Sequence, residues 1–392
     1  MTASAEALGI DIAIIDAGRE RNATLPAHWY YDPAIHEFEL NEIWNHRWLL
    51  AGTLSAIPNP GDFIVAKAGR VPVIVARGRD GEVKAYVNAC PHRAYPLATE
   101  PGKGAENGWT CLYHGWEFDL EGSLVKAPGT DVDPGFDPTR CELRRVALEL
   151  WGEAIFVNAD VNAPSLLEAH PNLTSFAADQ GLDPTFSDYE MFDSRTYDIG
   201  TNWKLFMDNF LECYHCPTVH PESLYKGFDG SAGKWEYTTE DELFSTHFVP
   251  DPEARDQSYF YGSLQAFPGF LIIQHNHFGV LCQAIPTGPD AIKYECYFYR
   301  QNGSPDQEVK TMVDVWEETF DEDFVLMEVH QRNVRDSGFS GQGYVRETEL
   351  LLIQFNNVLW AAYKNALGGG AAGRDGSRKS ISRMAAEGVS LP

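Results

Sequence analysis

The stretch that decides the fold is CPHRAYPLATEPGKGAENGWTCLYHGW, residues 90–116. It holds two short ligand pairs, Cys90 with His92 and Cys111 with His114, each at the end of a predicted strand. Two cysteines and two histidines can bind zinc, or a two-iron, two-sulfur cluster in which thiolates hold one iron and imidazoles hold the other. Each loop supplies one residue of each kind. This pairing favours two loop tips that grip opposite ends of a cluster.

Outward from these loops, residues 51–162 are predicted to form a small all-β domain. The run VPVIVARGRDGEVKAYVNAC has two β-rich stretches around Asp80-Gly81, which is a strong hairpin signal. The segments WEFDLEGSLV and ALELWGEAIFVNAD repeat the strand-turn-strand pattern. Before this domain, residues 1–50 predict an extended lead-in and an amphipathic helix that ends near Trp48.

Residues 163–367 predict a second domain of mixed α+β type. The segment 163–188 is rich in Pro, Asp and Ser and is expected to be a connection. Helices and aromatic-rich strands then follow, which predicts an antiparallel sheet with helices on one side, a helix-grip arrangement. We expect the helices at about 202–216 and 308–334, and the strands around 243–249, 257–283 and 291–300. The Gly-rich segment 368–392 is expected to be a flexible tail.

The composition excludes several classes of protein. Thirty Lys and Arg against 57 Asp and Glu give a formal net charge of −27 over 392 residues, which repels nucleic acid and anionic membranes. No window approaches the roughly 20 apolar residues of a membrane span, and the N-terminus lacks the pattern of a signal peptide. We therefore expect a cytoplasmic protein. Seven cysteines are too few for a disulfide scaffold in so long a chain, so reduced thiols are expected.

A second metal site is predicted in TNWKLFMDNFLECYHCPTVHP, residues 201–221. Its apolar residues recur at helical spacing, with Thr201 or Asn202 as the N-cap and Pro217 as the helix stop. These residues are Trp203, Phe206, Met207, Phe210 and Tyr214. The opposite face of this helix carries Asp208, Glu212 and His215. His220 follows closely enough to bring a second imidazole beside the first.

Two histidines need one carboxylate to form the facial triad of a non-haem iron site, which keeps open positions for oxygen and substrate. Asp208 and Glu212 are local candidates. Asp323 is a better one, because it lies within the apolar stripe of the acidic helix TMVDVWEETFDEDFVLMEVHQRNV, where an uncompensated carboxylate is costly. A buried ion pair with an arginine is the competing interpretation of Asp323.

These segments resemble the Rieske non-haem iron oxygenases. CPHR and CLYHGW match the Rieske signature C-x-H and C-x2-H, although the 18 residues between His92 and Cys111 are slightly more than is typical. NWK, DNF-L-ECYHC and HP resemble the mononuclear-iron motif of the family. DEDFVLMEVHQ resembles its C-terminal acidic helix, with Gln331 eight residues after Asp323.

The resemblance implies a terminal oxygenase in which Cys90, His92, Cys111 and His114 hold a [2Fe-2S] cluster. It also implies mononuclear Fe(II) on His215, His220 and Asp323, with O2 and electrons from NAD(P)H through a partner reductase, with or without a ferredoxin. In this family an acidic residue before the first ligand histidine links the cluster of one subunit to the iron of the next. By spacing Glu212 takes that role and Asp208 tunes the ligands, or the two exchange roles. A homotrimer is therefore expected, with His114 facing the next subunit's Glu212.

Two features of the sequence bear on the substrate. Glu at the bridge resembles the branch that acts on quaternary ammonium compounds such as choline, betaine and carnitine, which predicts monooxygenation or N-demethylation of a small substrate of that kind. The aromatic residues of strands 257–300 can cage a trimethylammonium group or stack an aromatic ring, so oxygenation of an aromatic compound is the alternative. A third reading, an electron carrier without oxygenase activity, leaves the second metal site unexplained.

Several nearby residues have plainer interpretations. Cys213 and Cys216 are expected to be buried thiols that point away from Asp208 and His215, although a zinc site on the two cysteines with His215 and His220 is an alternative. Cys141, Cys282 and Cys296 are expected to be core thiols. His275 and His277 alternate along one predicted strand, so both are expected on one side of the sheet, either lining a pocket or structural.

Overall fold

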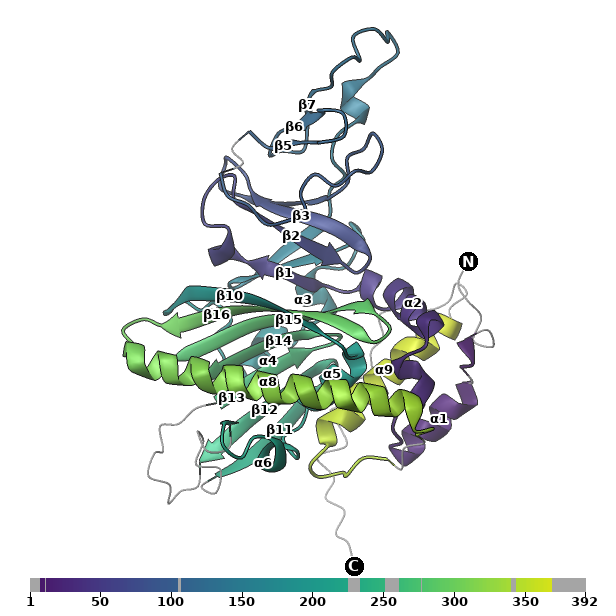
Figure 1. The fold of residues 1–392 in the computed structure, drawn as a ribbon, viewed down its shortest axis with the longest axis vertical. Coiled ribbons are helices and arrows are strands. Elements are labelled where there is room, and N and C mark those ends of the chain that lie inside the picture. Colours follow the sequence, from purple (N-terminus) through teal and green to yellow (C-terminus); the bar gives the residue numbers. More distant parts are fainter. Residues whose placement is uncertain are drawn as a thin grey trace, which may run out of the picture.

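The computed structural model describes residues 8–10, 12–104, 107–224, 233–250, 261–275, 277–339 and 343–368. In Figure 1 a lobe of small sheets stands above a large sheet that is crossed by one long helix. An all-β part is followed by an antiparallel sheet with helices, which confirms the α+β class. The segment 369–392, where a flexible tail was predicted, lies outside the described residues.

Two helices precede the first sheet, α1 (Ile12–Arg21) and α2 (Pro33–Glu42). Asp32 caps α2, because its side chain accepts a hydrogen bond of 2.8 Å from the backbone N–H of Ala34. The helix ends well before Trp48, where the sequence predicted its end, and a short 3-10 turn lies between. Both helices lie beside the C-terminal helix, as Figure 1 shows at the right of the molecule.

The all-β part consists of three small antiparallel sheets of three strands each. Their strands, in sheet order, are β1 (Leu49–Thr53), β9 (Ala154–Asn158) and β8 (Ala147–Trp151); β2 (Phe63–Ala68), β3 (Val71–Arg77) and β4 (Val83–Val87); and β5 (Trp109–Thr110), β6 (Glu117–Phe118) and β7 (Leu124–Lys126). The hairpin predicted at Asp80-Gly81 joins β3 to β4, and Gly81 has the positive φ of +84° that this turn requires.

The larger part is built on a seven-stranded antiparallel sheet in the order β10-β16-β15-β14-β13-β12-β11. Its strands are β10 (Tyr189–Ile199), β11 (Gly233–Glu240), β12 (Leu243–Pro250), β13 (Tyr261–Ala266), β14 (Phe270–His275), β15 (Phe278–Gly288) and β16 (Ala291–Gln301). Helices α5 (Trp203–Phe210), α6 (Cys216–Val219), α8 (Asp306–Asp336) and α9 (Leu350–Gly368) complete it. The acidic helix predicted at 308–334 corresponds to α8, which crosses the sheet in Figure 1.

The two faces of this sheet bury different partners. On β15, Val280 and Cys282 pack in one core cluster with the helices, whereas Leu281 between them packs in another with Trp48 and Phe156. Alternation of this kind follows from the two-residue period of a strand. One face therefore meets the helices that carry the site residues, and the other meets the all-β part.

Direct bonds tie the all-β part to the sheet. The backbone N–H of Leu50 donates to Gln283 Oε1 at 2.9 Å, and the Tyr299 hydroxyl donates to Glu153 Oε2 at 3.3 Å. Since Leu50 and Gln283 are both buried, this contact is shielded from competing water.

The segment 163–188 is more than the connection that the sequence predicted. It contains helices α3 (Leu166–Ala169) and α4 (Leu173–Asp179), and α3 begins with a capping box between Ser165 and Glu168. Strands β10 and β11 and helix α9 were likewise not anticipated. Strand β10 pairs with the distant strand β16, whereas β11 forms a hairpin with β12.

No helix among the described residues is long and apolar enough to cross a membrane. The longest one, α8, carries acidic side chains along its length.

Candidate active site

The two loops that carry the Cys/His pairs close in the same way. Cys90 accepts a backbone hydrogen bond of 2.8 Å from Ala94, and Cys111 accepts one of 2.9 Å from Gly115. Ala94 and Gly115 both have positive φ, +58° and +69°. Each loop is therefore a tight turn that presents its cysteine and, two or three residues later, its histidine.

The four side chains differ in burial in the way a cluster requires. Cys90 and Cys111 are 2% and 1% exposed, whereas His92 and His114 are exposed and their ring centroids lie 4.6 Å apart. Burial, together with the adjacent Cys111 thiol, raises the pKa of Cys90. Trp116 stacks on the His92 ring at 4.7 Å and 7°. Buried sulfurs and outward imidazoles fit a [2Fe-2S] cluster of the mixed-ligand kind.

The helix that was predicted over 202–216 is shorter in the structure. Asn202 caps it, as expected, but α5 ends at Phe210 and a turn leads to α6. Glu212 causes the break, because its carboxylate accepts hydrogen bonds from the backbone N–H groups of Tyr214 and His215 in place of helical bonds.

Two further expectations fail with that helix. Pro217 is not a stop but lies in the first turn of α6, where its missing N–H costs nothing. Tyr214, expected on the apolar face, is 57% exposed.

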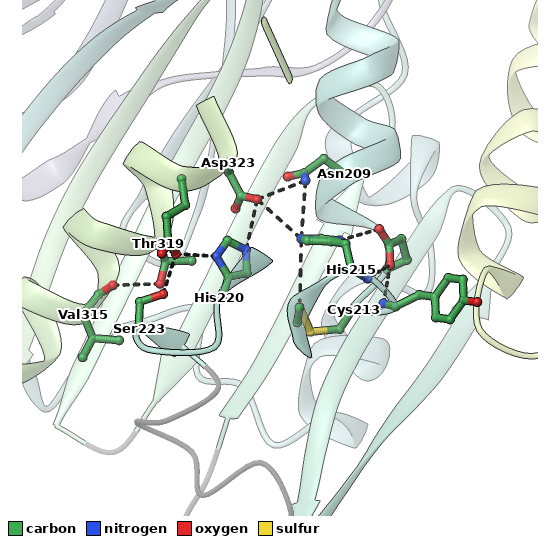
Figure 2. Close-up of polar contacts among 12 residues, drawn as sticks. Asn209, Cys213, His215, His220, Ser223, Val315, Thr319 and Asp323 are labelled. Carbon is green, nitrogen blue, oxygen red and sulfur yellow. Dashed lines mark hydrogen bonds and ion pairs between the residues drawn. A yellow bond between two sulfur atoms is a disulfide. The ribbon is translucent and has the colours of Figure 1, made fainter. Parts of the chain in front are cut away.

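The structure brings His215, His220 and Asp323 together, as Figure 2 shows. Asp323 Oδ1 lies 3.1 Å from His220 Nε2 and 3.4 Å from His215 Nε2. Donor atoms that bind one metal ion at about 2.1 Å and at right angles lie roughly 3 Å apart. Asp323 is 5% exposed, so its carboxylate is held in the apolar face of α8 by these two imidazoles.

The Nδ1 atom of each imidazole is hydrogen-bonded to a glutamate carboxylate. His215 Nδ1 is hydrogen-bonded to Glu212, and His220 Nδ1 lies 2.7 Å from Glu322 Oε2. Ser223 donates to the same Glu322 oxygen at 2.5 Å. Carboxylates at Nδ1 fix the ring orientation and leave both Nε2 atoms directed at a common point, which is the usual arrangement of metal-binding histidines.

The charges and hydrogen bonds of His215, His220 and Asp323 favour a positive charge between these three side chains. Burial acts to lower the pKa of His215, but hydrogen bonds to Asp323 and Glu212 outweigh it and raise that pKa to about 9. Burial acts to raise the pKa of Asp323, yet its hydrogen bonds to His215 and His220 lower it. A divalent cation suits a site with these preferences. The polar contacts of the Asp323 carboxylate are with His215, His220 and Asn209, which argues against the alternative that Asp323 forms a buried ion pair with an arginine.

Asn209 is a site residue that the sequence analysis missed. Its Nδ2 atom donates to Asp323 Oδ1 at 3.1 Å and lies 3.4 Å from His215 Nε2. Its Oδ1 atom is buried and has no hydrogen-bond partner among the described residues. The sequence signal that could have found Asn209 is its position in the same motif segment as His215 and His220.

Glu322 was also missed, since it lies off the apolar stripe of α8 and nothing local distinguishes it from its acidic neighbours. Gln331, in contrast, links distant segments. It accepts a hydrogen bond of 2.8 Å from the Asn202 N–H and donates one of 2.9 Å to the Tyr30 carbonyl. These bonds fix the start of α5 against α8, and so the segment with the two histidines against the helix that carries Asp323.

Asp208 is not hydrogen-bonded to His215, His220 or Asp323 in the described part of the chain. It is half-buried, and its Oδ2 atom accepts a hydrogen bond of 3.2 Å from Tyr30. Burial raises the pKa of Asp208 to about 7, and the negative charges of Glu349 and Glu212 act in the same direction. Glu212, not Asp208, is the carboxylate bonded to His215.

Cys213 and Cys216 were expected to be buried thiols that point apart. They are buried, but a disulfide joins them, with their Cα atoms 5.0 Å apart. The helical projection was wrong because α5 ends before both of them. In this linked form neither sulfur is a thiolate, which is the form a zinc site on this segment needs.

His275 and His277 do not share a face. His275 ends β14 and is 3% exposed, whereas His277 lies in the turn before β15 with φ of +71°. His277 Nδ1 lies 3.0 Å from Ser304 Oγ, and its Nε2 lies 3.0 Å from Glu308. The turn interrupts the alternation on which the prediction rested.

A small cavity adjoins His215, His220 and Asp323, and its volume is about 50 Å³. Tyr259 and Phe260, two of the aromatic residues expected near a pocket, lie outside the described residues. The lining residues are Asn209, Phe210, Glu212, Cys213, His215, Cys216, His220, Leu224, Trp235, Thr246, Tyr261, Gln265, Ile273, Trp316, Thr319 and Asp323.

Comparison with known families gives two matches. The Rieske [2Fe-2S] domain matches residues 47–141, and the catalytic domain of the ring hydroxylating alpha subunit matches residues 186–365. The first match covers the Cys/His loops, and the second covers the histidines, Asp323 and the sheet.

Individual proteins are similar over most of the chain. The carnitine monooxygenase oxygenase subunit of Escherichia coli K12 is 27% identical over 362 residues, 87% of this chain and 94% of the relative. The glycine betaine monooxygenase oxygenase subunit of Chromohalobacter salexigens is 29% identical over 397 residues, 86% of this chain and 85% of the relative. The quaternary ammonium Rieske monooxygenase CntA, solved with L-carnitine, has the same fold, with a TM-score of 0.77 and 24% identity over 90% of this chain and 99% of CntA.

Proposed function

The chain belongs to the Rieske non-haem iron oxygenases as a terminal oxygenase component, and from this premise we propose that it oxidises a small quaternary ammonium compound by monooxygenation or N-demethylation. The observation that carries the substrate proposal is the cavity beside the proposed ligands. Four aromatic rings line it, those of Phe210, Trp235, Tyr261 and Trp316. The relatives that act on carnitine and glycine betaine support the same substrate class.

The geometry of these rings suits a cation. The rings of Trp235 and Tyr261 meet edge to face at 5.2 Å and 87°, and those of Tyr261 and Trp316 are nearly parallel at 6.1 Å and 20°. Ring faces attract a desolvated ammonium group by cation–π interaction. The carboxylates of Glu212 and Asp323 on the same wall add attraction for positive charge.

Oxygenation of an aromatic compound is the second candidate, because the same rings can stack a planar substrate. The small volume of the cavity argues against a large ring system. A substrate panel separates the two candidates.

We propose that Cys90, His92, Cys111 and His114 hold the [2Fe-2S] cluster, and that the mononuclear iron is held by His215, His220 and Asp323. When bound, the cluster supplies single electrons and the iron activates O2. The protein contributes the orientation. Glu212 and Glu322 keep Nδ1 of the two imidazoles occupied, so that Nε2 of each is available to the metal.

Electron delivery is proposed to cross between subunits of a homotrimer. Figure 1 supports this, because strands β5 to β7, beside the cluster loops, and helix α6, beside the ligand histidines, lie at opposite ends of the molecule. His114 is exposed at one end, and Glu212 contacts His215 at the other. A head-to-tail ring brings the His114 of one subunit to the Glu212 of the next.

The oxygenase takes electrons from a reductase and acts on a small substrate. We propose that the electrons originate from NAD(P)H, that a ferredoxin is optional, and that the protein works in the cytoplasm. The exposed apolar side chains beside the outward histidines, Tyr95, Leu112 and Tyr113, support the proposed contact of that tip with the next subunit. We also propose domain limits of 51–162 for the Rieske domain and 163–367 for the catalytic domain.

Oxygen uptake tests the substrate proposal. The purified holoenzyme, supplied with a surrogate reductase, is given a panel of trimethylammonium compounds and aromatic acids, and the products are identified by mass spectrometry. We expect oxygen uptake coupled to product formation with the ammonium compounds. Turnover of the aromatic acids with no turnover of any ammonium compound would establish the second candidate instead.

A further inference from the structure

Besides Asn209 Oδ1, three buried polar atoms on the cavity wall have no hydrogen-bond partner among the described residues: Thr246 Oγ1, Gln265 Oε1 and Trp316 Nε1. Their residues are 5%, 2% and 4% exposed. Leaving a buried donor or acceptor unpaired is costly, so each such atom in a native protein requires an explanation. Three of them around one cavity indicate a ligand that completes their hydrogen bonds.

The sheet places two of these residues on the cavity side. Thr246 of β12 lies directly opposite Ser263 of β13, and Gln265 follows two residues along the same strand, so all three side chains share a face. Trp316 faces them from α8, which covers this side of the sheet. Ser245, next to Thr246, points to the other face.

Ser263 determines which end of the Gln265 amide is free. Its hydroxyl has one proton, which it donates to the Thr246 carbonyl at 3.1 Å. It must therefore accept the hydrogen bond that joins it to Gln265 at 2.9 Å, so the atom on that side is the amide nitrogen Nε2. The oxygen Oε1 is left as an acceptor and requires a donor from the ligand.

The hydrogen-bonding requirements of the three unpaired atoms match a hydroxyl group on the ligand. Gln265 Oε1 needs a donor, the Trp316 N–H needs an acceptor, and the Thr246 hydroxyl can serve as either. An alcohol supplies both functions from one atom, whereas an ionised carboxylate cannot donate to Gln265. Resting on the quaternary ammonium function proposed above, we propose that Thr246, Gln265 and Trp316 bind a substrate hydroxyl and select alcohol-bearing ammonium compounds.

The test compares choline with propyltrimethylammonium, which replaces the hydroxyl by a methyl group of similar size. Isothermal titration calorimetry is done on the oxidised holoenzyme, so that no turnover is required. We expect choline to bind at least about tenfold more tightly, because the analogue leaves the buried polar atoms unpaired.

Variants test which residues cause the preference for choline over propyltrimethylammonium. Gln265→Leu and Thr246→Val are each expected to reduce the choline preference by roughly threefold to tenfold while the analogue binds as before. Trp316→Phe also weakens the cation–π contact proposed for this ring, so it is expected to weaken the binding of both compounds and that of choline more. Thr246→Ser keeps the hydroxyl and is expected to keep the preference. Ser245→Ala removes a buried hydroxyl on the opposite face of the same strand and is the matched control for folding effects. The visible spectrum of the cluster verifies that each variant is folded.

The outcomes separate the two proposals. Equal affinity for choline and its analogue in the wild type would overturn the hydroxyl inference, and so would equal losses for both compounds in the cavity variants. Either result leaves the quaternary ammonium function intact as long as trimethylammonium compounds are still oxidised. If no trimethylammonium compound binds or turns over, the proposed function fails and the inference fails with it.

Discussion

Glu322 Oε2 lies 2.7 Å from Nδ1 of His220, on the position of α8 directly before Asp323. One helical turn thus supplies both a proposed metal ligand and the carboxylate that orients another ligand. A hydrogen-bonded carboxylate holds the imidazole in one tautomer and increases its basicity. The consequences for metal binding can be measured.

Replacing Asp323 by Ala is expected to remove the mononuclear iron and leave the cluster. Iron analysis should fall from about three to about two atoms per chain, with the Rieske absorption retained, because the two sites share no ligand. Oxygen uptake should be abolished. A variant that kept three irons and full turnover would show that Asp323 is not a ligand.

Glu322→Gln is expected to weaken binding of the mononuclear iron by roughly 10- to 100-fold, because His220 loses the carboxylate at Nδ1. The measurement is competition for iron with a chelator of known affinity. Glu318→Gln is the matched control, since Glu318 lies exposed on the same helix. Equal iron affinity in the two variants would contradict an orienting role for Glu322.

Glu212→Gln is expected to separate iron binding from electron delivery. The amide retains much of the local hydrogen bonding, so both metal centres should remain, while reoxidation of the reduced cluster during a single turnover slows by roughly 100-fold. Stopped-flow absorbance follows the cluster directly. If reoxidation proceeds at the wild-type rate, the proposed electron path does not pass through Glu212.

The pH dependence of stability provides a test of Asp208. Its pKa is raised from 3.8 to about 7, so the folded state binds a proton more tightly than the unfolded state. Its stabilising contribution is fully present below pH 3.8 and is lost as the pH rises to about 7. The amide in the Asp208→Asn variant cannot ionise, so its free energy of unfolding should change less with pH over that window. At pH 8 it should exceed that of the wild type by a few kcal/mol. Urea unfolding of both proteins at pH 5 and pH 8 measures these free energies. The same change in unfolding free energy between the two pH values in both proteins would refute the raised pKa of Asp208.

A buried ion pair anchors α5 to α2. Lys204 Nζ lies 2.6 Å from Glu39 Oε1, both side chains are at most 1% exposed, and the Trp203 N–H donates to the other Glu39 oxygen at 2.7 Å. Lys204→Met leaves the Glu39 charge unpaired and should cost about 3–5 kcal/mol. The double variant with Glu39→Gln should recover part of this loss. Unfolding monitored by tryptophan fluorescence measures both, and a single variant as stable as wild type would contradict the prediction.

The sequence predicted the parts of the site that depend on local pattern. The Cys/His spacing requires only two short loops, and the apolar stripe of α8 marked Asp323 because a carboxylate on a buried face needs a partner. It placed Glu212 near His215 for the wrong reason, since a helix was assumed where a turn exists. A side chain that captures two backbone N–H groups has no periodic signature.

The sequence by itself predicted two separate sets of candidate ligands and their donor types, and it determined the order of the two domains, because these depend on residues close together in the chain. Only the tertiary structure decided what joins them. Glu322 reaches His220 across 102 residues, and Gln265 and Trp316 meet at one cavity from a strand and a helix. The physical reason is that the free energy of such contacts comes from burial between distant segments, which no local pattern encodes.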